Sequence, residues 1–393
     1  MMNSNFGALE GLVVLDLTQM LAGPFCTQLL ADHGAEVIKI EPPTGDVART
    51  FGPFLPEDEE EQFGGYFQSI NRNKYSIVLD LKKKEDINYF KKMAAKADVV
   101  VENFREGVME RLGVGFTTLS ELNPKLVYAS IRGFGDSKLG PSPYQNWPAY
   151  DVVAQAMSGL MGITGTENGP IKIGPGIGDI VPGMMAAFGI VSAVLNAKNS
   201  GKGQYVDISM SDTLLALCER IIYQYSYSGE IPSPEGRHHP NFAPFGIFPT
   251  KDGFVTIACP SDKFWATLCH KLNKPEWIAD IRFSSNTLRA KNRDALNNNL
   301  ETVTQNYTKE ELLSLFGGVI PFGPILDAKE IFADEHFNAR GMLHKLTLET
   351  IERPVTIAGI PMKLSRTPGK IRARAPMLGE HTSGVLKKFN LSE

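Results

Sequence analysis

Short apolar runs alternate with helix-like stretches through the first third of the chain, and this alternation limits the possible folds more than any other feature. The runs are LVVLD, EVIKIE, YSIVLDL, DVVVEN and LVYASIRGFG, at residues 12–16, 36–41, 75–81, 98–103 and 126–135. Each run has the length of a buried strand, and polar loops and helix-like segments separate them. Repeated strand and helix units build a parallel sheet covered by helices on both faces. We therefore predict an α/β fold with a parallel sheet.

The chain length predicts more than one domain, because 393 residues are roughly two to three times the size of a typical domain. We expect a large domain over residues 1–225 and a smaller α+β domain over residues 226–335. Ser, Gly, Pro, His and aromatic residues concentrate at 226–246, which marks the crossing between the two. Residues 336–393 should return to the large domain, where we expect an antiparallel partner for the strand-like segments HKLTLE and PVTIAGIPMKLS.

In a parallel sheet of this kind, ligands bind beyond the carboxyl ends of the strands, where the following loops gather. Three loops fit that description, at residues 18–24, 41–49 and 103–107. The first, TQMLAGP, lacks the GxGxxG pattern of dinucleotide-binding proteins, which argues against a nicotinamide enzyme. The GKGQ segment at 201–204 leads into a strand, so we interpret it as a tight turn and not as a phosphate-binding loop.

Composition excludes several partner classes. The formal net charge is −4 and the charges are spread out, which gives no field to gather nucleic acid or anionic lipid. The chain begins without the pattern of a secretory leader, and we expect no uncharged run as long as a membrane span. The cysteines lie in mainly apolar segments without metal-finger spacing, as is typical of reduced thiols, at Cys26, Cys218, Cys259 and Cys269. We expect a cytoplasmic protein with neither nucleic acid nor membrane as its partner.

The stretch IKIGPGIGDIVPG at residues 171–183 sets one carboxylate, Asp179, among glycines, prolines and apolar side chains. Burying an ionised carboxyl group without a cation is unfavourable unless a substrate or backbone donors meet it. The glycines at 174, 176 and 178 would let a ligand approach the backbone, whose amides could face a developing oxyanion. Asp179 is therefore a candidate nucleophile. The alternative interpretation is that it caps the apolar helix that begins near Pro182.

Many short motifs agree in order and spacing with one known family. They are LEGLVVLDLTQMLAGPF, GAEVIKIEPPTGDVAR, NRNKYSIVLDL, DVVVENFREGVMERLG, NPKLVYASIRGFG, AYDVVAQAMSGLMGITG, GIGDIVPG, NSGKGQYVDISM, VIPFGPI and LGEHT. Together they resemble the class III coenzyme A transferases, the CaiB/BaiF family that includes formyl-CoA transferase. The resemblance covers essentially the whole chain. It implies a Rossmann-like large domain, a smaller domain and an interlocked homodimer in which each chain threads the other.

The resemblance also implies a reaction. In this family an Asp attacks the thioester of the donor, and the matching residue here is Asp179. An acyl-aspartyl anhydride forms, CoA attacks it to give an aspartyl-CoA thioester, and the carboxylate of the acceptor completes the transfer, with neither a metal nor a redox cofactor. The wording of LDLTQMLAGPF, NRNKYSIVLDL and VENFREG is most similar to members that use succinyl-CoA and dicarboxylic acids. The expected substrates are thus an acyl-CoA and a small carboxylic acid.

CoA-binding positions of the family can be matched one by one. The matching residues are Met20, Leu21, Leu79, Lys82, Asn103, Phe104 and Arg111. In the family the first two touch CoA through their backbone, the next two lie near the adenine, and the last three belong to the nucleotide-binding loop. For Lys82 and Arg111 the alternative is an ordinary solvated helix face.

One phosphate-binding position departs from the family pattern. An Arg that some members use for a CoA phosphate is replaced here by Pro42. We expect one of the nearby cations, Lys39, Arg49 or Arg72, to take its place.

Two further positions bear on the acyl and acceptor groups. The α-methylacyl-CoA racemases of the same superfamily have a His before the acid that matches Asp151, whereas this chain has Tyr150. Because tyrosine, with an ordinary pKa of about 10, is a poor base for an α-proton, transfer is favoured over racemisation. Tyr150 is expected to bond an acyl carbonyl or simply to pack, and His238 and His239 could meet the carboxylate of an acceptor.

A protein that binds CoA without turnover, with a role in regulation or assembly, is the alternative from another functional class. The long linkers around 197–205, 226–246 and 330–345 would permit an interlocked homodimer, as the resemblance implies.

Overall fold

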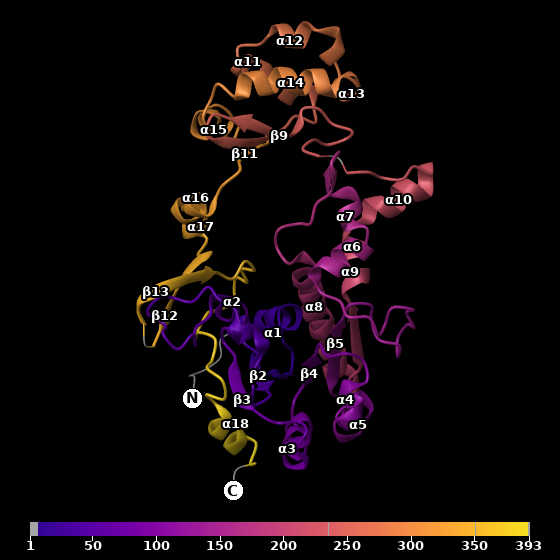
Figure 1. Ribbon diagram of the computed structural model, residues 1–393, viewed down its shortest axis with the longest axis vertical. Coiled ribbons are helices and arrows are strands. Elements are labelled where there is room, and N and C mark those ends of the chain that lie inside the picture. The colour runs from indigo at the N-terminus through magenta and orange to yellow at the C-terminus, as the bar shows by residue number, and fades with distance from the viewer. Residues whose placement is uncertain (1–6, 235, 350, 392–393) are drawn as a thin grey trace. The chain divides into compact units, whose positions relative to one another are not determined.

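The computed structural model describes residues 7–234, 236–349 and 351–391 (Figure 1). Residues 1–6, on which the expectation about a secretory leader partly rests, lie outside this range. Internal contacts divide the chain into two compact units. The first comprises Met1–Leu160, Ile173–Gly229 and Glu335–Glu393, and the second comprises Met161–Lys172 and Glu230–Asp334.

A six-stranded parallel sheet with the order β3-β2-β1-β4-β5-β8 forms the centre of the first unit. Its strands are β1 (Val13–Asp16), β2 (Glu36–Glu41), β3 (Tyr75–Val78), β4 (Val99–Glu102), β5 (Val127–Arg132) and β8 (Tyr205–Ser209). The register pairs Val14 with Val37 on one side and with Val99 on the other. The predicted α/β fold is confirmed. The first five strands of the chain, β1 to β5, each lie within one of the five apolar runs named above.

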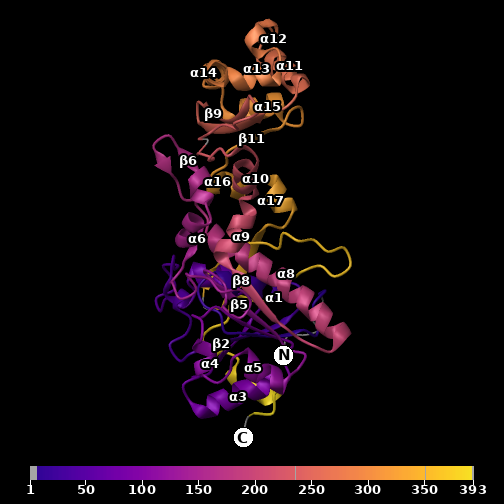
Figure 2. The same cartoon turned by 90° about the vertical axis from the view of Figure 1, so that its right-hand side faces the viewer.

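Helices lie on both faces of this sheet (Figures 1 and 2). The helices of the first unit are α1 (Ala22–Asp32), α2 (Gly65–Ile70), α3 (Lys84–Ala94), α4 (Val108–Arg111), α5 (Phe116–Leu122), α6 (Asp151–Met157), α8 (Ile177–Ser200), α9 (Met210–Leu217), α10 (Glu219–Ser228) and α18 (Thr382–Lys388), with a short 3-10 helix at Val47–Thr50. Because successive side chains of a strand point to opposite faces, Val14 packs with α1 and α8, whereas Leu15 packs with α3, α5 and α18.

Helix α8 is, within the described part of the chain, the one helix whose length and composition would suffice to cross a membrane. The uncharged run between Asp179 and Lys198 has 18 residues. The expectation that no run reaches this length is therefore wrong. A core helix passes the same test, and α8 contacts α1, β5 and β8 and buries Ala186 and Ile190 in the core of the first unit.

A three-stranded antiparallel sheet with the order β11-β10-β9 is the centre of the second unit. The elements of this unit are β6 (Gly165–Thr166), β7 (Gly169–Pro170), β9 (Phe245–Thr250), β10 (Gly253–Ala258), α11 (Asp262–Lys271), α12 (Glu276–Ala279), a 3-10 helix at Ile281–Phe283, α13 (Asn286–Lys291), α14 (Arg293–Thr304), α15 (Lys309–Phe316), β11 (Phe322–Pro324) and α16 (Ala328–Ala333). Phe248, Trp265 and Leu300 lie in its core. Residues 161–172, predicted to be part of the large domain, belong to this second unit, where Gly236 N donates to Gly165 O at 3.0 Å.

The C-terminal segment corrects one expectation about strand pairing. Its elements include α17 (Glu335–Ala339), β12 (Leu343–Leu348) and β13 (Ile351–Ala358). Helix α7 (Leu160–Ile163) lies instead where the chain first passes from the first unit to the second. β12 and β13 pair with each other, Leu343 opposite Ala358, and not with a strand of the large sheet. A hairpin of adjacent segments closes a shorter loop than a pairing with a distant edge, which lowers the entropic cost. Further on, His381 N donates to Ser76 O of β3 at 2.9 Å.

Candidate active site

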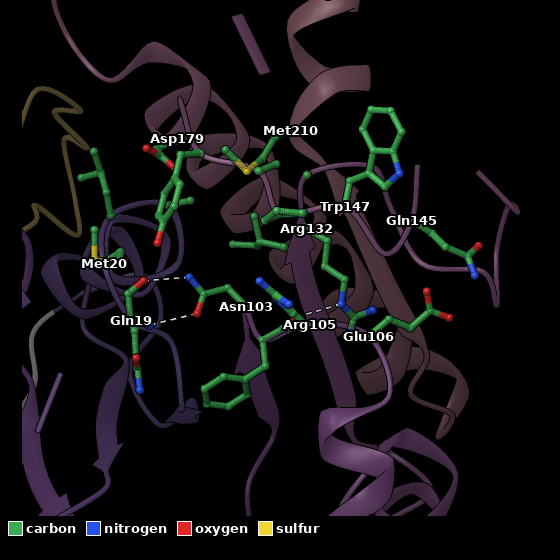
Figure 3. Close-up of a pocket in the computed structure, with 18 of the residues that line it drawn as sticks. Gln19, Met20, Asn103, Arg105, Glu106, Arg132, Gln145, Trp147, Asp179 and Met210 are labelled. Atoms are coloured by element: carbon green, nitrogen blue, oxygen red, sulfur yellow. Dashed lines mark hydrogen bonds between the residues drawn. The ribbon is translucent and has the colours of Figure 1, made fainter. Parts of the chain in front are cut away.

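A cavity of about 260 Å³ opens at the carboxyl ends of β1, β4 and β5, the side of the sheet expected to bind ligands (Figure 3). Its walls come from the loops after β1 and β4, from residues 145–150 and from the first turn of α8. The cavity brings together six residues singled out from the sequence: Met20, Leu21, Asn103, Phe104, Tyr150 and Asp179.

Asp179 lies in the first turn of α8 and faces this cavity. Its carboxylate has no hydrogen-bond partner within the described ranges. The side chain that caps this turn is Asp151 of α6, whose Oδ1 accepts from Gly178 N at 2.8 Å. Gln155 Nε2 donates to the same carboxylate at 2.8 and 3.0 Å. The interpretation of Asp179 as a capping residue is therefore wrong, since Asp151 performs that role.

The surroundings of Asp179 disfavour its charge. Burial and, second, the nearby carboxylate of Asp151 raise the pKa of Asp179 to about 7. A helix N-terminus favours negative charge, but here it is shared between two acids. Near neutral pH the carboxyl group of Asp179 is thus divided between its protonated and ionised forms.

Two of the glycines around Asp179 allow close packing within the protein itself. A Cβ atom at Gly178 would lie 2.7 Å from Asp151 O, and one at Gly176 would lie 2.9 Å from Leu21 Cδ2, whereas Gly174 has open space. The amide of Gly178 donates to Asp151, and that of Ile177 donates to Pro175 O at 2.8 Å. These two amides already have acceptors and are consequently not available to an oxyanion in this structure, whereas a role of the backbone at Gly174 and Gly176 stays a prediction.

Asn103 joins the two loops that border the cavity. Its Nδ2 donates to Gln19 O at 2.7 Å and its Oδ1 accepts from Gln19 N at 2.9 Å, as Figure 3 shows. These bonds use the carboxamide on both sides. In this structure Asn103 therefore sets the distance between the loop after β1 and the loop after β4.

The three cations expected to replace the missing Arg at Pro42 do not present their charge to the cavity. Lys39 is fully buried and donates to Thr18 O and to Asp46 Oδ2, at 2.7 and 2.9 Å. Arg49 binds both carboxylate oxygens of Glu41, and Arg72 binds Asp32. Each of the three cations thus neutralises a buried carboxylate of the first unit, and a CoA phosphate contact by any of them stays a prediction.

Three other predicted CoA-binding residues lie outside the cavity walls. Leu79 is buried in the core of the sheet, whereas Lys82 and Arg111 are exposed. Because both side chains are exposed, Lys82 and Arg111 are compatible with either interpretation, a contact with the nucleotide of CoA or an ordinary solvated helix face. Tyr150 does line the cavity, although 63% of its surface is exposed. The histidines at 238 and 239 line a separate hollow within the second unit.

Sequence reasoning missed several polar residues at the cavity. Arg132 Nε donates to Phe104 O at 3.1 Å, and Phe104 N donates to Glu102 Oε2 at 2.8 Å. The buried ion pair of Arg132 and Glu102 therefore bonds both backbone polar groups of Phe104, in the loop after β4. Burial raises the pKa of Glu102 to about 7. Arg105 follows Phe104 directly and lines the cavity, so the VENFREG motif itself carried that signal.

Tyr66 of α2 was also missed. Burial, followed by the charges of Asp179 and Asp46, raises the pKa of its hydroxyl to about 12. The tyrosine therefore stays protonated near Asp179. Nothing in the local sequence, GGYFQSI, distinguishes it from a packing residue.

Comparison with known proteins decides the family. The sequence model described as CoA-transferase family III matches residues 9–382. The chain belongs to this family. It is therefore an enzyme, a family III CoA-transferase.

This family III CoA-transferase has relatives of known name along its full length. It is 45% identical to the succinyl-CoA:mesaconate CoA-transferase of Haloarcula hispanica, over 97% of this chain and 96% of the relative. It is 39% identical to the acetyl-CoA:oxalate CoA-transferase of Acetobacter aceti, over 98% and 97%. Among solved structures, a CaiB/BaiF family protein from Brucella suis matches with a TM-score of 0.88 and 36% identity, over 98% of this chain and 100% of that chain.

Proposed function

We propose that this transferase moves coenzyme A from succinyl-CoA to a dicarboxylic acid, with Asp179 as the covalent nucleophile. The observation that carries the proposal is the carboxylate of Asp179, which faces the cavity and has no hydrogen-bond partner among the described residues, while Asp151 caps the helix in its place. The names of the relatives support the substrate class, because mesaconate and oxalate are both dicarboxylates. The donor is proposed from the relative with 45% identity.

The proposed reaction conserves atoms in four steps. A carboxylate oxygen of Asp179 attacks the thioester carbonyl, and CoA thiolate leaves as a mixed anhydride forms. The thiolate then attacks the carbonyl of Asp179, which releases the donor carboxylate and leaves an aspartyl-CoA thioester. The acceptor carboxylate attacks this thioester to give a second anhydride and thiolate, and attack of the thiolate on the acceptor carbonyl yields the new acyl-CoA and restores Asp179.

The geometry suits a carboxylate nucleophile. A carboxylate of ordinary pKa is a weak nucleophile, and a raised pKa gives a more basic oxygen. Fixing it beside the thioester supplies an effective concentration on the order of 10⁵ M or more. Met20, Leu21 and Phe104 would cover the pantetheine arm and keep water from the anhydrides. No step uses a metal or a redox group.

Oxygen labelling would test the covalent route directly. With a dicarboxylate acceptor labelled with ¹⁸O in its carboxylates, the four steps leave one acceptor oxygen on Asp179 after a turnover. The peptide that contains Asp179 should therefore gain one ¹⁸O atom after a turnover, and only when donor and acceptor are both present. Mass spectrometry of that peptide would detect the label. Transfer through a direct ternary complex would leave the peptide unlabelled and would refute the proposal.

Trapping gives a second readout. Incubation with succinyl-CoA followed by hydroxylamine or borohydride should modify Asp179, and the Asp179→Asn variant should show neither the adduct nor transfer. Native-rate transfer by that variant would contradict the nucleophile. Reversible CoA binding without an adduct would favour the passive CoA-binding protein instead.

Substrate choice needs a panel. Succinyl-CoA and acetyl-CoA should be compared as donors against dicarboxylates and matched monocarboxylates, with formation of the new thioester as readout. We expect succinyl-CoA with a dicarboxylate to give the highest kcat/KM. Deuterium wash-in at the α-carbon of a 2-methylacyl-CoA, without any acceptor, would instead indicate racemase activity.

The proposed assembly is an interlocked homodimer. Apolar side chains exposed on α8 and α10 support it, among them Phe188, Leu195 and Tyr227.

A further inference from the structure

The loop after β1, residues 18–21, contains a residue in an unfavourable backbone conformation. Met20 has a φ of +68°, in the left-handed region that side chains other than glycine seldom occupy. Met20 and Leu21 both line the cavity, and Leu21 Cδ2 packs over Gly176, which precedes the turn that carries Asp179. The conformation of this loop therefore shapes the wall of the cavity beside the proposed nucleophile.

Two buried side chains hold this loop from behind. Lys39 Nζ donates to Thr18 O at 2.7 Å and to Asp46 Oδ2 at 2.9 Å. Asp46 Oδ1 accepts from Met20 N at 3.2 Å. Neither side chain has any exposed surface. The pair thus satisfies one carbonyl and one amide of the loop, on either side of Gln19.

The pair is itself anchored in the sheet. Asp46 N donates to Glu41 Oε2 at 3.0 Å, and Arg49 binds both oxygens of that Glu41 carboxylate. Asp46 Oδ1 also accepts from Ala48 N at 3.0 Å. Hydrogen bonds thus connect the loop after β1 through Asp46 to Glu41 at the end of β2.

A second buried pair in the same unit provides a contrast. Arg72 Nη2 binds Asp32 Oδ2 at 2.8 Å, with both side chains almost fully buried. The partners of this pair lie at Asn73 and Ala358, and neither residue lines the cavity. The two pairs are alike in burial and charge, and they differ in that only one touches the cavity loop.

We propose that Lys39 and Asp46 are positioning residues for acyl-CoA, which act by holding residues 18–21 in the binding conformation. This role differs from the predicted contact of Lys39 with a CoA phosphate. The inference rests on the proposed function in so far as the cavity is taken to hold the acyl-CoA. A charge-assisted bond contributes more than a neutral one, so its loss should weaken CoA binding on the order of tenfold.

The test compares Asp46→Asn with Asp32→Asn as a matched control. Calorimetry would measure the Kd for CoA, which needs no turnover, and steady-state kinetics would measure KM for each substrate. We expect Asp46→Asn to raise the Kd for CoA and the KM for acyl-CoA about tenfold, with the KM for the acceptor changed less than about twofold. Asp32→Asn should lower the unfolding midpoint in urea to a similar extent and leave the Kd unchanged.

A double variant covers the case in which Asp46→Asn does not fold. Lys39→Met combined with Asp46→Leu removes both charges together, and such replacements often preserve stability. This variant should fold and still bind CoA about tenfold more weakly. Wild-type Kd in either folded Asp46 variant, or an equal loss in Asp32→Asn, would overturn the inference.

Failure of the proposed function would show separately. If the wild type binds CoA but forms no adduct at Asp179, the covalent mechanism fails while the comparison of Kd values still decides the role of Lys39 and Asp46. If the wild type binds no CoA, both proposals fall.

Discussion

The environment of Asp179 works against the stability of the folded chain. Its pKa is raised to about 7 by burial and by the Asp151 carboxylate, so ionisation of Asp179 is easier in the unfolded state than in the folded one. Groups placed for chemistry often carry such a penalty, because the preorganised site is not the most stable arrangement. The penalty has a pH dependence whose sign follows from the pKa.

The Asp179→Asn variant should be more stable than the wild type at high pH only. In the range between about pH 4 and pH 7 the folded wild type binds more protons than the unfolded chain, so its stability falls as the pH rises. At about pH 8 we expect the variant to exceed the wild type by about 2 kcal/mol, a figure reduced for partial exposure of the carboxyl group. Urea unfolding at about pH 8 and about pH 4 would measure this, and an equal advantage at both pH values would contradict the raised pKa.

The pH profile of the reaction tests the contribution of Asp151. If ionised Asp179 is the nucleophile, kcat/KM for acyl-CoA should rise with pH and level off above about pH 7. Asp151→Asn removes the neighbouring charge but retains an oxygen that accepts from the Gly178 amide. Its profile should shift to lower pH. An unshifted midpoint would show that burial alone raises the pKa of Asp179.

At the scale of elements, helix α8 approaches α1 closely at a glycine. A Cβ atom at Gly183 would lie 2.6 Å from Ala22 O, a backbone atom that cannot swing aside. Gly183 stands about one helical turn after Asp179, so this contact also fixes how far the first turn of α8 stands from the loop after β1.

Gly183→Ala should therefore destabilise the protein. Overpacking at a backbone contact costs roughly 1–3 kcal/mol, which outweighs the gain in helix propensity of up to about 1 kcal/mol. Gly384→Ala in α18 is the matched control, because a Cβ atom there meets nothing within 4 Å. We expect the control to unfold at the same or a slightly higher urea concentration, and a stable Gly183→Ala would show that the two helices can separate without loss.

At the scale of the whole molecule, α8 and α10 expose several large apolar side chains to solvent. Phe188, Leu195 and Tyr227 expose 70%, 62% and 92% of their surface. Large exposed apolar patches often mark protein–protein interaction sites, so these side chains support the proposed dimer. A second copy of the chain is the proposed partner, since most soluble oligomers are symmetric homo-oligomers.

The proposed interlocked dimer should not dissociate on dilution. Threaded chains separate only when part of the fold opens, so sedimentation should show the dimer even at nanomolar protein. A monomer peak under those conditions would contradict interlocking. Multi-angle light scattering at micromolar protein would then distinguish an ordinary dimer from a monomer.

The local pattern of the chain was sufficient for the strands of the sheet and for the motif that carries Asp179. Alternation of apolar runs and helical stretches is a short-range property, and the shared motifs are contiguous, so both are visible without coordinates. The same holds for Met20, Leu21, Asn103, Phe104 and Tyr150, which the structure brings to one cavity. The division of roles among charged residues was not visible in this way.

Only the tertiary structure decided which charged residues pair with each other in the interior. Lysine and arginine are the residue types that bind phosphate. Each of the three candidates, Lys39, Arg49 and Arg72, is nevertheless paired with a buried carboxylate. Asp151 takes the capping role from Asp179 because α6 and α8 converge, although 27 positions separate Asp151 from Gly178. Burial and pairing depend on residues far apart in the chain, so an identical local sequence is compatible with either outcome.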